Sequence, residues 1–332
     1  MTSAIPVSQA RISAIGTHVP ERVLTNRDLE RLVETSDEWI VQRTGIHERR
    51  IAANDEFTSD LCVKAVENLV ERHQVRLADI DFVIVSTATP DAPFPSVASQ
   101  VHHRLGLSRT AGAIDISAAC AGFVHGLNMA NALITSEQCR KVLVIGAETL
   151  SKITDYTDRT TCILFGDAAG AVLVEHDSKE PSFIRSVSTT DGSAGIHLYC
   201  SGIADRIGGK PILRNGKLVQ NGREVFKIAV HTLVREIPPL LAEEGLTPGD
   251  LDLFVPHSAN IRIIEAVCSR IGIPMEKVLF SATRYGNTSS ASIPLALKDG
   301  MDAGKLKRGD LVLLSGFGGG FVHTSTLIRW TI

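Results

Sequence analysis

The chain has 332 residues, a formal net charge of −3 at pH 7 and 44% apolar residues. This length accommodates one large domain or two halves of ordinary size, with enough apolar residues for a sizeable core. The slightly acidic balance excludes a whole-chain electrostatic preference for nucleic acid or an anionic membrane surface. Residues 1–16 lack a signal-peptide pattern, and no window holds the roughly 18 apolar residues of a membrane-spanning helix, so we expect a cytoplasmic protein.

Apolar strands alternate with helical segments along the chain. In the first part we expect strands at 81–89, 111–117, 141–148 and 170–176, and helices at 95–106 and 120–136. After a loop-rich stretch we expect a helix at 223–245 that ends or kinks near Pro238 and Pro239. Strands at 251–257, 310–316 and 321–330 and helices at 258–272 and 289–304 complete the pattern. The alternation predicts an α/β fold whose sheets are covered by helices on both faces.

A sequence repeat predicts that this fold is doubled. "LADIDFVIV" begins at Leu77 and "PGDLDLFVP" at Pro248 (248 − 77 = 171). "VLVIG" begins at Val142 and "VLLSG" at Val312 (312 − 142 = 170). We therefore expect two similar halves, residues 1–178 and 179–332, although chance recurrence of such strands is the alternative.

Six cysteines are scattered along the chain, and none forms a CxxC pair. This spacing argues against a zinc ribbon or a thioredoxin-type redox site, so we expect free thiols in a reducing compartment and no metal site. The cysteines are Cys62, Cys120, Cys139, Cys162, Cys200 and Cys268.

One of these cysteines, Cys120, stands where a predicted strand turns into a predicted helix, in "DISAACAGFVHGL". Its alanine and glycine neighbours leave open space beside the sulfur. The unpaired N–H groups of a helix start would stabilise a thiolate and lower the thiol pKa. The alternative is a buried structural cysteine.

Three further segments supply polar groups of the kinds that acyl transfer uses. His257 follows a predicted strand at its C-terminal end, where ligands bind in α/β sheets, and Asn287 lies in a turn before a helix. The glycines of "SGFGGGFVH" (315–323) expose backbone N–H groups. Taken singly, these features are more simply a core histidine, a turn residue and a tight loop. Together with Cys120 they fit transfer of an acyl group through a thioester.

Other enzyme classes fit the sequence less well. A cysteine protease uses the same residue types, but the protease signatures around the cysteine are absent. No GxGxxG with a following helix and acid is present, and no GxxxxGK[ST], which excludes dinucleotide and P-loop sites.

The chain resembles the β-ketoacyl-[acyl-carrier-protein] synthase III family of the thiolase superfamily, from about Ile12 to the C-terminus. The resemblance implies a thiolase-like fold of five layers, αβαβα, and a homodimer. It also implies an acyltransferase that condenses a starter acyl-CoA with malonyl-[acyl-carrier-protein], with loss of CO2, to initiate type II fatty acid synthesis. No cofactor is implied, because coenzyme A enters as the thioester substrate. Six segments carry the resemblance in the family's order: "TSDEWIVQRTGIHERRIA", "ACAGF", "DRTTCILFGDAAGAVL", "VPHSANIRII", "YGNTSSASIP" and "FGGGF".

The resemblance assigns roles to individual residues. Cys120 resembles the acylated nucleophile, His257 and Asn287 complete its triad, and the Gly319 and Cys120 N–H groups resemble the oxyanion hole. The residues that resemble the coenzyme A contacts are Thr35, Trp39, Arg43, Arg159, Gly222 and Asn260. Those that resemble the acyl pocket are Leu150, Phe165, Phe317 and Phe94, the last reaching across the dimer interface. Those that resemble a docking patch for the acidic carrier protein are Lys227, Arg262 and Arg270.

Two departures concern the coenzyme contacts. Where this chain has Ser258, the family's best-known members carry Gln. Where it has Arg223, they carry Asn. The "HSAN" version resembles a paralogous form of Gram-positive bacteria that is linked to branched-chain starters, so acetyl-CoA and branched acyl-CoA both stay open. Alternative functions are a starter-loading or condensing enzyme of a polyketide or alkylquinolone pathway, and a catalytically idle paralogue that acts as a binding subunit. A thiolase would need a second catalytic cysteine near "FGGGFVHTS", which has none.

Overall fold

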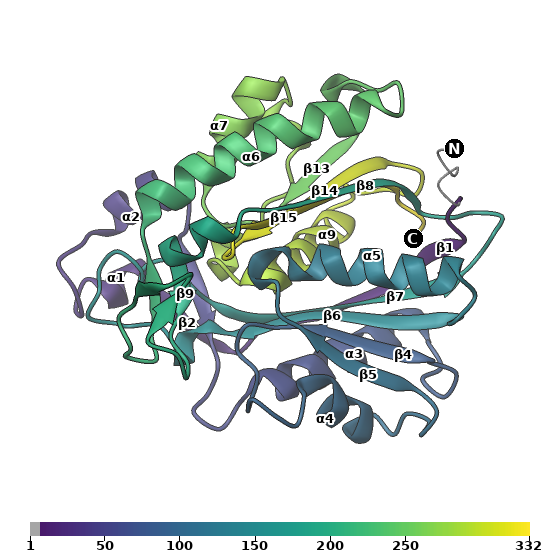
Figure 1. Cartoon of the computed structure of the whole chain (residues 1–332), viewed down its shortest axis with the longest axis horizontal. Coiled ribbons are helices and arrows are strands. Elements are labelled where there is room, and N and C mark those ends of the chain that lie inside the picture. Colours follow the sequence, from purple (N-terminus) through teal and green to yellow (C-terminus); the bar gives the residue numbers. More distant parts are fainter. Residues whose placement is uncertain (1–6) are drawn as a thin grey trace.

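The computed structural model describes residues 7–332 (Figure 1). The predicted absence of a signal peptide rests on residues 1–16, the first six of which lie outside the described residues. Within 7–332, no helix combines the length and apolar character needed to cross a bilayer.

Two sheets form the framework of the molecule. The first is mixed and has the strand order β1-β7-β6-β4-β5. Its strands are β1 (Ala10–His18), β7 (Asp167–His176), β6 (Lys141–Thr149), β4 (Phe82–Ser86) and β5 (Gly112–Ile116). The second has the order β13-β14-β15-β8. Its strands are β13 (Leu253–Pro256), β14 (Leu311–Gly318), β15 (Val322–Arg329) and β8 (Phe183–Thr190).

Helices fill the space between the sheets and cover both outer faces, which makes five layers (Figure 1). The central layer consists of α5 (Gly122–Thr135) and α9 (Ser292–Asp302). The outer layers consist of α3 (Thr58–His73) and α4 (Val97–Arg104) on the first sheet, and α6 (Gly222–Ala242) and α7 (Ile261–Ile271) on the second. Apolar cores lie in the interfaces between these layers. Because each buried Leu, Ile, Val or Phe contributes ~1.5–3 kcal/mol, these cores decide how the layers pack.

The two sheets carry corresponding elements at a constant offset. Helix α9 begins at Ser292 and α5 at Gly122 (292 − 122 = 170). Strand β14 begins at Leu311 and β6 at Lys141, which gives the same offset (311 − 141 = 170). The predicted repeat therefore corresponds to matching elements of the two sheets. The division of the chain at residue 178 stays a prediction.

The prolines do not end the predicted helix at 223–245. Helix α6 continues through Pro238 and Pro239 as far as Ala242. The residues after the prolines, Leu240 and Leu241, are buried in the core under this helix. Packing of that last turn outweighs the helix bond that each proline removes.

Smaller elements surround one end of the central layer. Two excursions from the sheets form them, one near the N-terminus and one in the loop-rich stretch after β8. The elements are β2 (Arg22–Thr25), α1 (Asn26–Leu29), α2 (Asp37–Thr44), β3 (Glu48–Ile51), β9 (Leu198–Cys200), β10 (Arg206–Ile207), β11 (Lys210–Pro211) and β12 (Leu218–Gln220). A further short helix, α8 (Ala282–Tyr285), lies between α7 and α9. Strand β2 pairs with β3, and β9 with β12.

Candidate active site

Cys120 lies in a short 3-10 turn, Ala119–Ala121, that leads directly into α5. The backbone before it is strained, because Ala119 has φ +45°. The turn sits close to the first sheet, since a Cβ on Gly122 would lie 1.8 Å from the Ser86 Oγ. The sulfur lines a cavity although Cys120 is only 8% exposed. The sequence-based interpretation of a thiol beside open space at a helix start therefore agrees with its position.

His257 follows β13 directly and is 1% exposed. Its Nδ1 lies 2.8 Å from the Ser292 Oγ, and that oxygen accepts a hydrogen bond from the Ser258 N–H. The Ser292 hydroxyl proton is then free to be donated to Nδ1, which leaves the ring proton on Nε2. Burial lowers the pKa of His257 to about 3, while a hydrogen bond with the Ser289 backbone opposes this shift. The imidazole is therefore neutral at pH 7 and presents an N–H donor.

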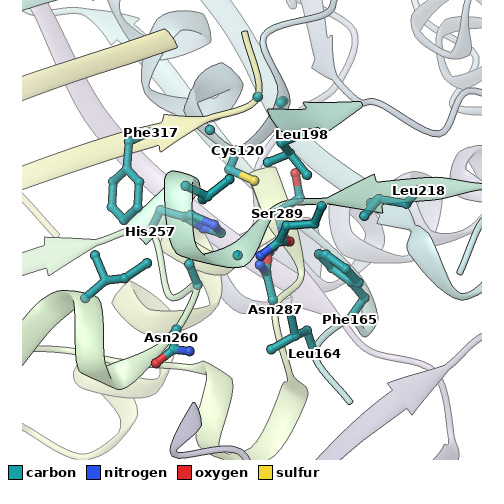
Figure 2. Close-up of a pocket in the computed structure, with 18 of the residues that line it drawn as sticks. Cys120, Leu164, Phe165, Leu198, Leu218, His257, Asn260, Asn287, Ser289 and Phe317 are labelled. Carbon is teal, nitrogen blue, oxygen red and sulfur yellow. Dashed lines mark hydrogen bonds between the residues drawn. The ribbon is translucent and has the colours of Figure 1, made fainter. Parts of the chain in front are cut away.

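Asn287 lies between α8 and a second 3-10 turn, Ser289–Ala291, that leads into α9. Its Oδ1 accepts a hydrogen bond of 2.9 Å from the Ser289 N–H. This contact fixes the orientation of the amide, so the Nδ2 group remains available as a donor. Figure 2 shows the Cys120 sulfur, the His257 ring and Asn287 grouped around one space, with Phe165 and Leu218 to one side. The three predicted triad residues are thus brought together from both halves of the chain.

A single cavity of 1040 Å³ connects these groups with the surface. Gly318 and Gly319 line it beside Cys120. A Cβ on Gly318 would lie 2.9 Å from the Cys120 N and 3.2 Å from its Sγ, so the chain can approach the sulfur only as glycine. Gly319 is one residue further along this wall, and its backbone N–H is the predicted second oxyanion donor.

The prediction of a lowered thiol pKa is wrong for Cys120. Burial raises the pKa of Cys120 to about 12, and the charge of Glu148 adds to this effect, while a hydrogen bond with Ser289 opposes it. The field of the α5 N-terminus favours the thiolate, but it acts on a sulfur that is almost fully desolvated. Burial of the sulfur thus opposes the effect of the helix start.

The predicted coenzyme residues lie at the outer end of the cavity. The Arg159 guanidinium is 5.0 Å and that of Arg43 5.8 Å from the centre of the Trp39 ring. These three residues come from α2 and from the loop after β6, and Trp39 and Arg43 line the cavity. Thr35 lies just before α2, and its buried Oγ1 has no hydrogen-bond partner. An aromatic ring flanked by cations is suited to an adenine that carries phosphates.

Between this end and Cys120, the wall includes Gly222 and Asn260, both of which line the cavity. Asn260 caps α7, since its Oδ1 accepts the Arg262 N–H at 2.9 Å, and its amide N–H groups remain for another acceptor. Of the two departures from the family pattern, Arg223 is exposed at the start of α6. Ser258, by contrast, is fully buried and accepts the Ser281 N–H at 3.0 Å, so it supports the backbone near His257 rather than the entrance.

The predicted acyl-pocket residues fall into three situations. Leu150 and Phe165 are buried and line the cavity. Phe317 also lines it but packs edge-on against the His257 ring, at 5.2 Å between centroids. Phe94 is 85% exposed and lies outside the cavity of its own chain. This exposure fits a side chain that contacts another molecule.

The three predicted docking cations lie on the helices above the cavity, Lys227 on α6 and Arg262 and Arg270 on α7. All three are exposed. Lys227 forms an ion pair with Glu224, and the Arg262 Nε donates to the Gln42 carbonyl, while Arg262 also lines the cavity. Among residues 7–332, no group of three or more His, Cys, Asp or Glu side chains is placed to hold a metal ion.

Comparisons with known proteins decide the family. The family model described as 3-oxoacyl-[acyl-carrier-protein (ACP)] synthase III matches residues 114–192, and that of its C-terminal region matches residues 241–330. The chain is 57% identical to a protein named β-ketoacyl-[acyl-carrier-protein] synthase III 2 of Halalkalibacterium halodurans, over 98% of both chains. The chain belongs to the β-ketoacyl-[acyl-carrier-protein] synthase III family.

Other relatives agree. The protein of the same name in Bacillus subtilis is 55% identical over 98% of this chain and 99% of that one. The crystal structure of β-ketoacyl-[acyl-carrier-protein] synthase III from Thermus thermophilus has a TM-score of 0.92 at 48% identity, covering 96% of this chain and 99% of that chain. These findings confirm the predicted thiolase-like five-layer fold and the predicted resemblance to the Gram-positive paralogues. They confirm a condensing acyltransferase that starts fatty acid synthesis, and they do not favour the polyketide or idle-subunit alternatives.

Several residues that shape this synthase III site were not predicted from the sequence. Ser292 contacts His257, Ser289 donates its N–H to Asn287 and lines the cavity, and Leu198 and Leu218 lie on its apolar side (Figure 2). Leu198 and Leu218 belong to the loop-rich stretch, where alternation is too short to reveal strands. The serines stand within "TSSAS", and nothing in their spacing distinguishes the one that faces the thiol from its neighbours.

Proposed function

We propose that Cys120 carries the starter acyl group, with acetyl-CoA or a short branched acyl-CoA as donor and malonyl-[acyl-carrier-protein] as acceptor. The observation that carries this proposal is the convergence of Cys120, His257 and Asn287 at the inner end of one cavity whose outer end holds Trp39. A mass gain of the protein on mixing with acyl-CoA, absent when Cys120 is replaced, tests it. The product is a 3-oxoacyl-[acyl-carrier-protein].

In the first half-reaction the sulfur of Cys120 attacks the thioester carbonyl of acyl-CoA. The carbonyl oxygen becomes an oxyanion, and the Cys120 and Gly319 N–H groups stabilise it. One such donor is worth ~3 kcal/mol in the transition state. Coenzyme A then leaves, and the acyl chain occupies the apolar side of the cavity beside Leu150 and Phe165.

In the second half-reaction His257 and Asn287 act on the malonyl thioester. Loss of CO2 leaves an enolate, and the Nε2–H of neutral His257 and the Nδ2–H of Asn287 donate to its oxygen. The orientation of both groups supports this role, since Ser292 engages Nδ1 and the Ser289 N–H engages the Asn287 Oδ1. The enolate carbon attacks the acyl group and releases Cys120. This scheme needs no metal or redox cofactor and belongs in the cytoplasm, where acyl-CoA and carrier protein are available.

A second copy of the chain is proposed to complete the acyl pocket. Strand β5 is the edge of the first sheet and carries Ile114, which is 42% exposed at its middle. Phe94 lies near the same edge, just before α4, which packs on β5. Pairing of two β5 strands would extend the sheet across a two-fold axis and turn Phe94 towards the partner's cavity.

Ile114→Asp is expected to convert the dimer to monomers, because two carboxylates would face each other near the axis. Sedimentation should give twice 35.7 kDa for the wild type and about half of that value for the variant. Ile184→Asp is the matched control, since Ile184 is 39% exposed on β8, the edge of the other sheet. A monomeric wild type, or dissociation by the control alone, would contradict the proposed interface.

The nucleotide and the carrier protein are proposed to use different residues at the mouth. Trp39→Ala is expected to raise the KM for acyl-CoA about tenfold, because the ring interacts with two guanidinium groups and the adenine.

Arg270→Glu is expected to raise the KM for malonyl-carrier protein several-fold, because it reverses a charge that steers an acidic partner. Steady-state kinetics with each substrate varied in turn measures both.

Matched variants separate these effects from general damage. The Lys152 Nζ lies over the Phe57 ring, 4.6 Å from its centre, so Phe57 is a second aromatic residue with a cation beside it. Phe57→Ala should leave both KM values unchanged. Arg235 is an exposed arginine further along α6, and Arg235→Glu serves the same purpose for Arg270. If Trp39→Ala raised the KM for acyl-CoA and the KM for malonyl-carrier protein equally, the proposal that the two substrates use different residues would be wrong.

A further inference from the structure

Arg49 is a fully buried arginine on β3 that the mechanism above does not use. Its Nη1 donates hydrogen bonds to the Asn26 Oδ1 at 2.8 Å and to the Leu24 carbonyl at 3.2 Å. Its Nη2 donates to the Ile163 carbonyl at 2.7 Å. All three acceptors are neutral oxygens, and the buried Nε has no hydrogen-bond partner among residues 7–332. A cation is costly to bury against neutral groups alone, so its presence beside the site calls for a reason.

The guanidinium group joins two parts of the chain that are 114 residues apart in sequence. Its Nη1 side faces the excursion near the N-terminus. There Asn26 donates from its Nδ2 to the Asp37 Oδ1 at 2.7 Å and to the Ile46 carbonyl at 2.9 Å, which ties the same residues to the first turn of α2. Its Nη2 side faces the segment 163–166, whose first three residues line the cavity. A planar guanidinium presents its donors in fixed directions, so it can hold two backbones at a set distance.

The segment 163–166 in turn holds Asn287 by its backbone. The Asn287 N–H donates to the Leu164 carbonyl at 2.8 Å, and the Asn287 carbonyl accepts the Gly166 N–H at 3.0 Å. Phe165 and Asn287 thus pair as residues of a parallel sheet do. Figure 2 shows Leu164 and Phe165 beside Asn287. The position of the Asn287 amide therefore follows the position of this segment.

The side chain of Arg49 also packs against the turn that carries Asn287. A Cβ on Gly286 would lie 2.8 Å from the Arg49 Cβ, and a Cβ on Gly166 would lie 3.1 Å from it. Gly286 has φ +69°, in the left-handed region that favours glycine. Arg49 is therefore in close contact with both backbone segments that fix Asn287.

Other contacts hold the remaining two members of the triad. The His257 N–H donates to the Ser315 carbonyl of β14 at 2.8 Å. Cys120 lies in its own turn at the start of α5. Loss of the Arg49 guanidinium should therefore affect the half-reaction that uses Asn287 more than the acylation of Cys120.

We propose that Arg49 is a positioning residue for the second half-reaction, and that it holds the Asn287 amide within reach of the enolate oxygen through the segment 163–166. The hydrogen bonds of Nη1 anchor the guanidinium group to the excursion near the N-terminus. This anchor fixes where Nη2 places the Ile163 carbonyl, and hence where the paired Asn287 backbone lies. The inference rests on the role of Asn287 in the proposed function.

Single-turnover measurement of acylation and discharge tests this role in Arg49→Met, which keeps most of the aliphatic stem but lacks the guanidinium group. Acylation of Cys120 and the KM for acyl-CoA should stay within a few-fold of the wild type. Discharge by malonyl-carrier protein should fall at least about tenfold, because a small displacement of a reacting group is costly. In an Asn287→Ala background, which has no amide to position, Arg49→Met should cause little further loss.

A merely structural role of Arg49 predicts a different result. General loosening of the fold would slow acylation and discharge by the same factor, and Arg49→Met would add its full loss to that of Asn287→Ala. Either result would overturn the positioning role. Arg50→Met is the matched control, because Arg50 is the next residue of β3, points to the other face of the strand and donates to the Pro20 carbonyl at 3.2 Å. This control should change neither half-reaction.

Two further measurements cover an unstable variant and an inactive enzyme. If Arg49→Met does not fold, Arg49→Lys keeps a buried cation without the planar fork, and it should show the same selective loss of discharge at a smaller magnitude. A crystal structure of either variant should show the segment 163–166 and Asn287 displaced together, with His257 in place. An unmoved Asn287 would overturn the proposal. Absence of acyl-Cys120 in the wild type would refute the proposed function, and the crystal structure would still decide whether Arg49 sets the position of Asn287.

Discussion

Cys120→Ala is expected to abolish acyl-enzyme formation and to reduce condensation to background. The sulfur of Cys120 lies where the Gly318–Gly319 wall, His257 and Asn287 meet in the cavity, and a thiol is a stronger nucleophile than the serine hydroxyls beside it. Removing it leaves the carbonyl without an attacking group, whereas the rest of the site persists. Intact-protein mass after incubation with acyl-CoA measures the effect, since the wild type should gain one acyl group.

The matched control for this substitution is Cys268→Ala. Cys268 is also buried, on α7, and burial raises its thiol pKa to about 11. The control should therefore acquire the acyl group at the wild-type rate, with at most a small loss of stability from the vacated volume. Acylation of Cys120→Ala, or loss of acylation in the control, would show that another thiol is the nucleophile.

His257→Ala and Asn287→Asp are expected to separate the two half-reactions. Both should be acylated at Cys120 within a few-fold of the wild-type rate, because neither group holds the first oxyanion. Discharge by malonyl-carrier protein should fall by about 10²–10³ in each, because one donor to the enolate oxygen is lost. The double variant should lose less than the product of the two factors, since the donors act on one oxygen.

His323→Gln provides a control for burial. His323 is fully buried on β15, where its Nε2 lies 2.8 Å from the Ser325 Oγ, and burial lowers its pKa to about 4. Its replacement should reduce stability without slowing discharge. Rapid-quench measurement of acyl-enzyme decay separates the variants. Equal losses of acylation and discharge in His257→Ala would contradict the assignment to the second half-reaction.

The alternation of strands and helices made most of the two sheets and the central helices predictable. The strands around Val142 and Val312 and the helices after Cys120 and Asn287 lie where periodicity indicated them. Whether α6 ends at its prolines could not be predicted, because the sequence shows the bonds that prolines remove but not the packing that replaces them. The short strands β9 to β12 were not predicted, because each is only two or three residues long.

In the candidate site, only the residues whose side chains take part in the proposed reaction could be predicted from the sequence. Cys120, His257 and Asn287 stand at strand ends or helix starts, so the fold class alone brings them near one another. The high thiol pKa could not be predicted, since it depends on how completely the second sheet and the Ser289 turn exclude water from the sulfur.

The most direct test of the account is sequential mass measurement on the wild-type protein. The protein is mixed with acetyl-, isobutyryl-, isovaleryl- or octanoyl-CoA, its mass is recorded, and malonyl-carrier protein is then added. The account predicts a gain of one acyl group on Cys120 with acetyl-CoA or a short branched acyl-CoA, and its discharge as a 3-oxoacyl-carrier protein. Absence of acylation by every donor, or an acyl group that malonyl-carrier protein does not discharge, would contradict it.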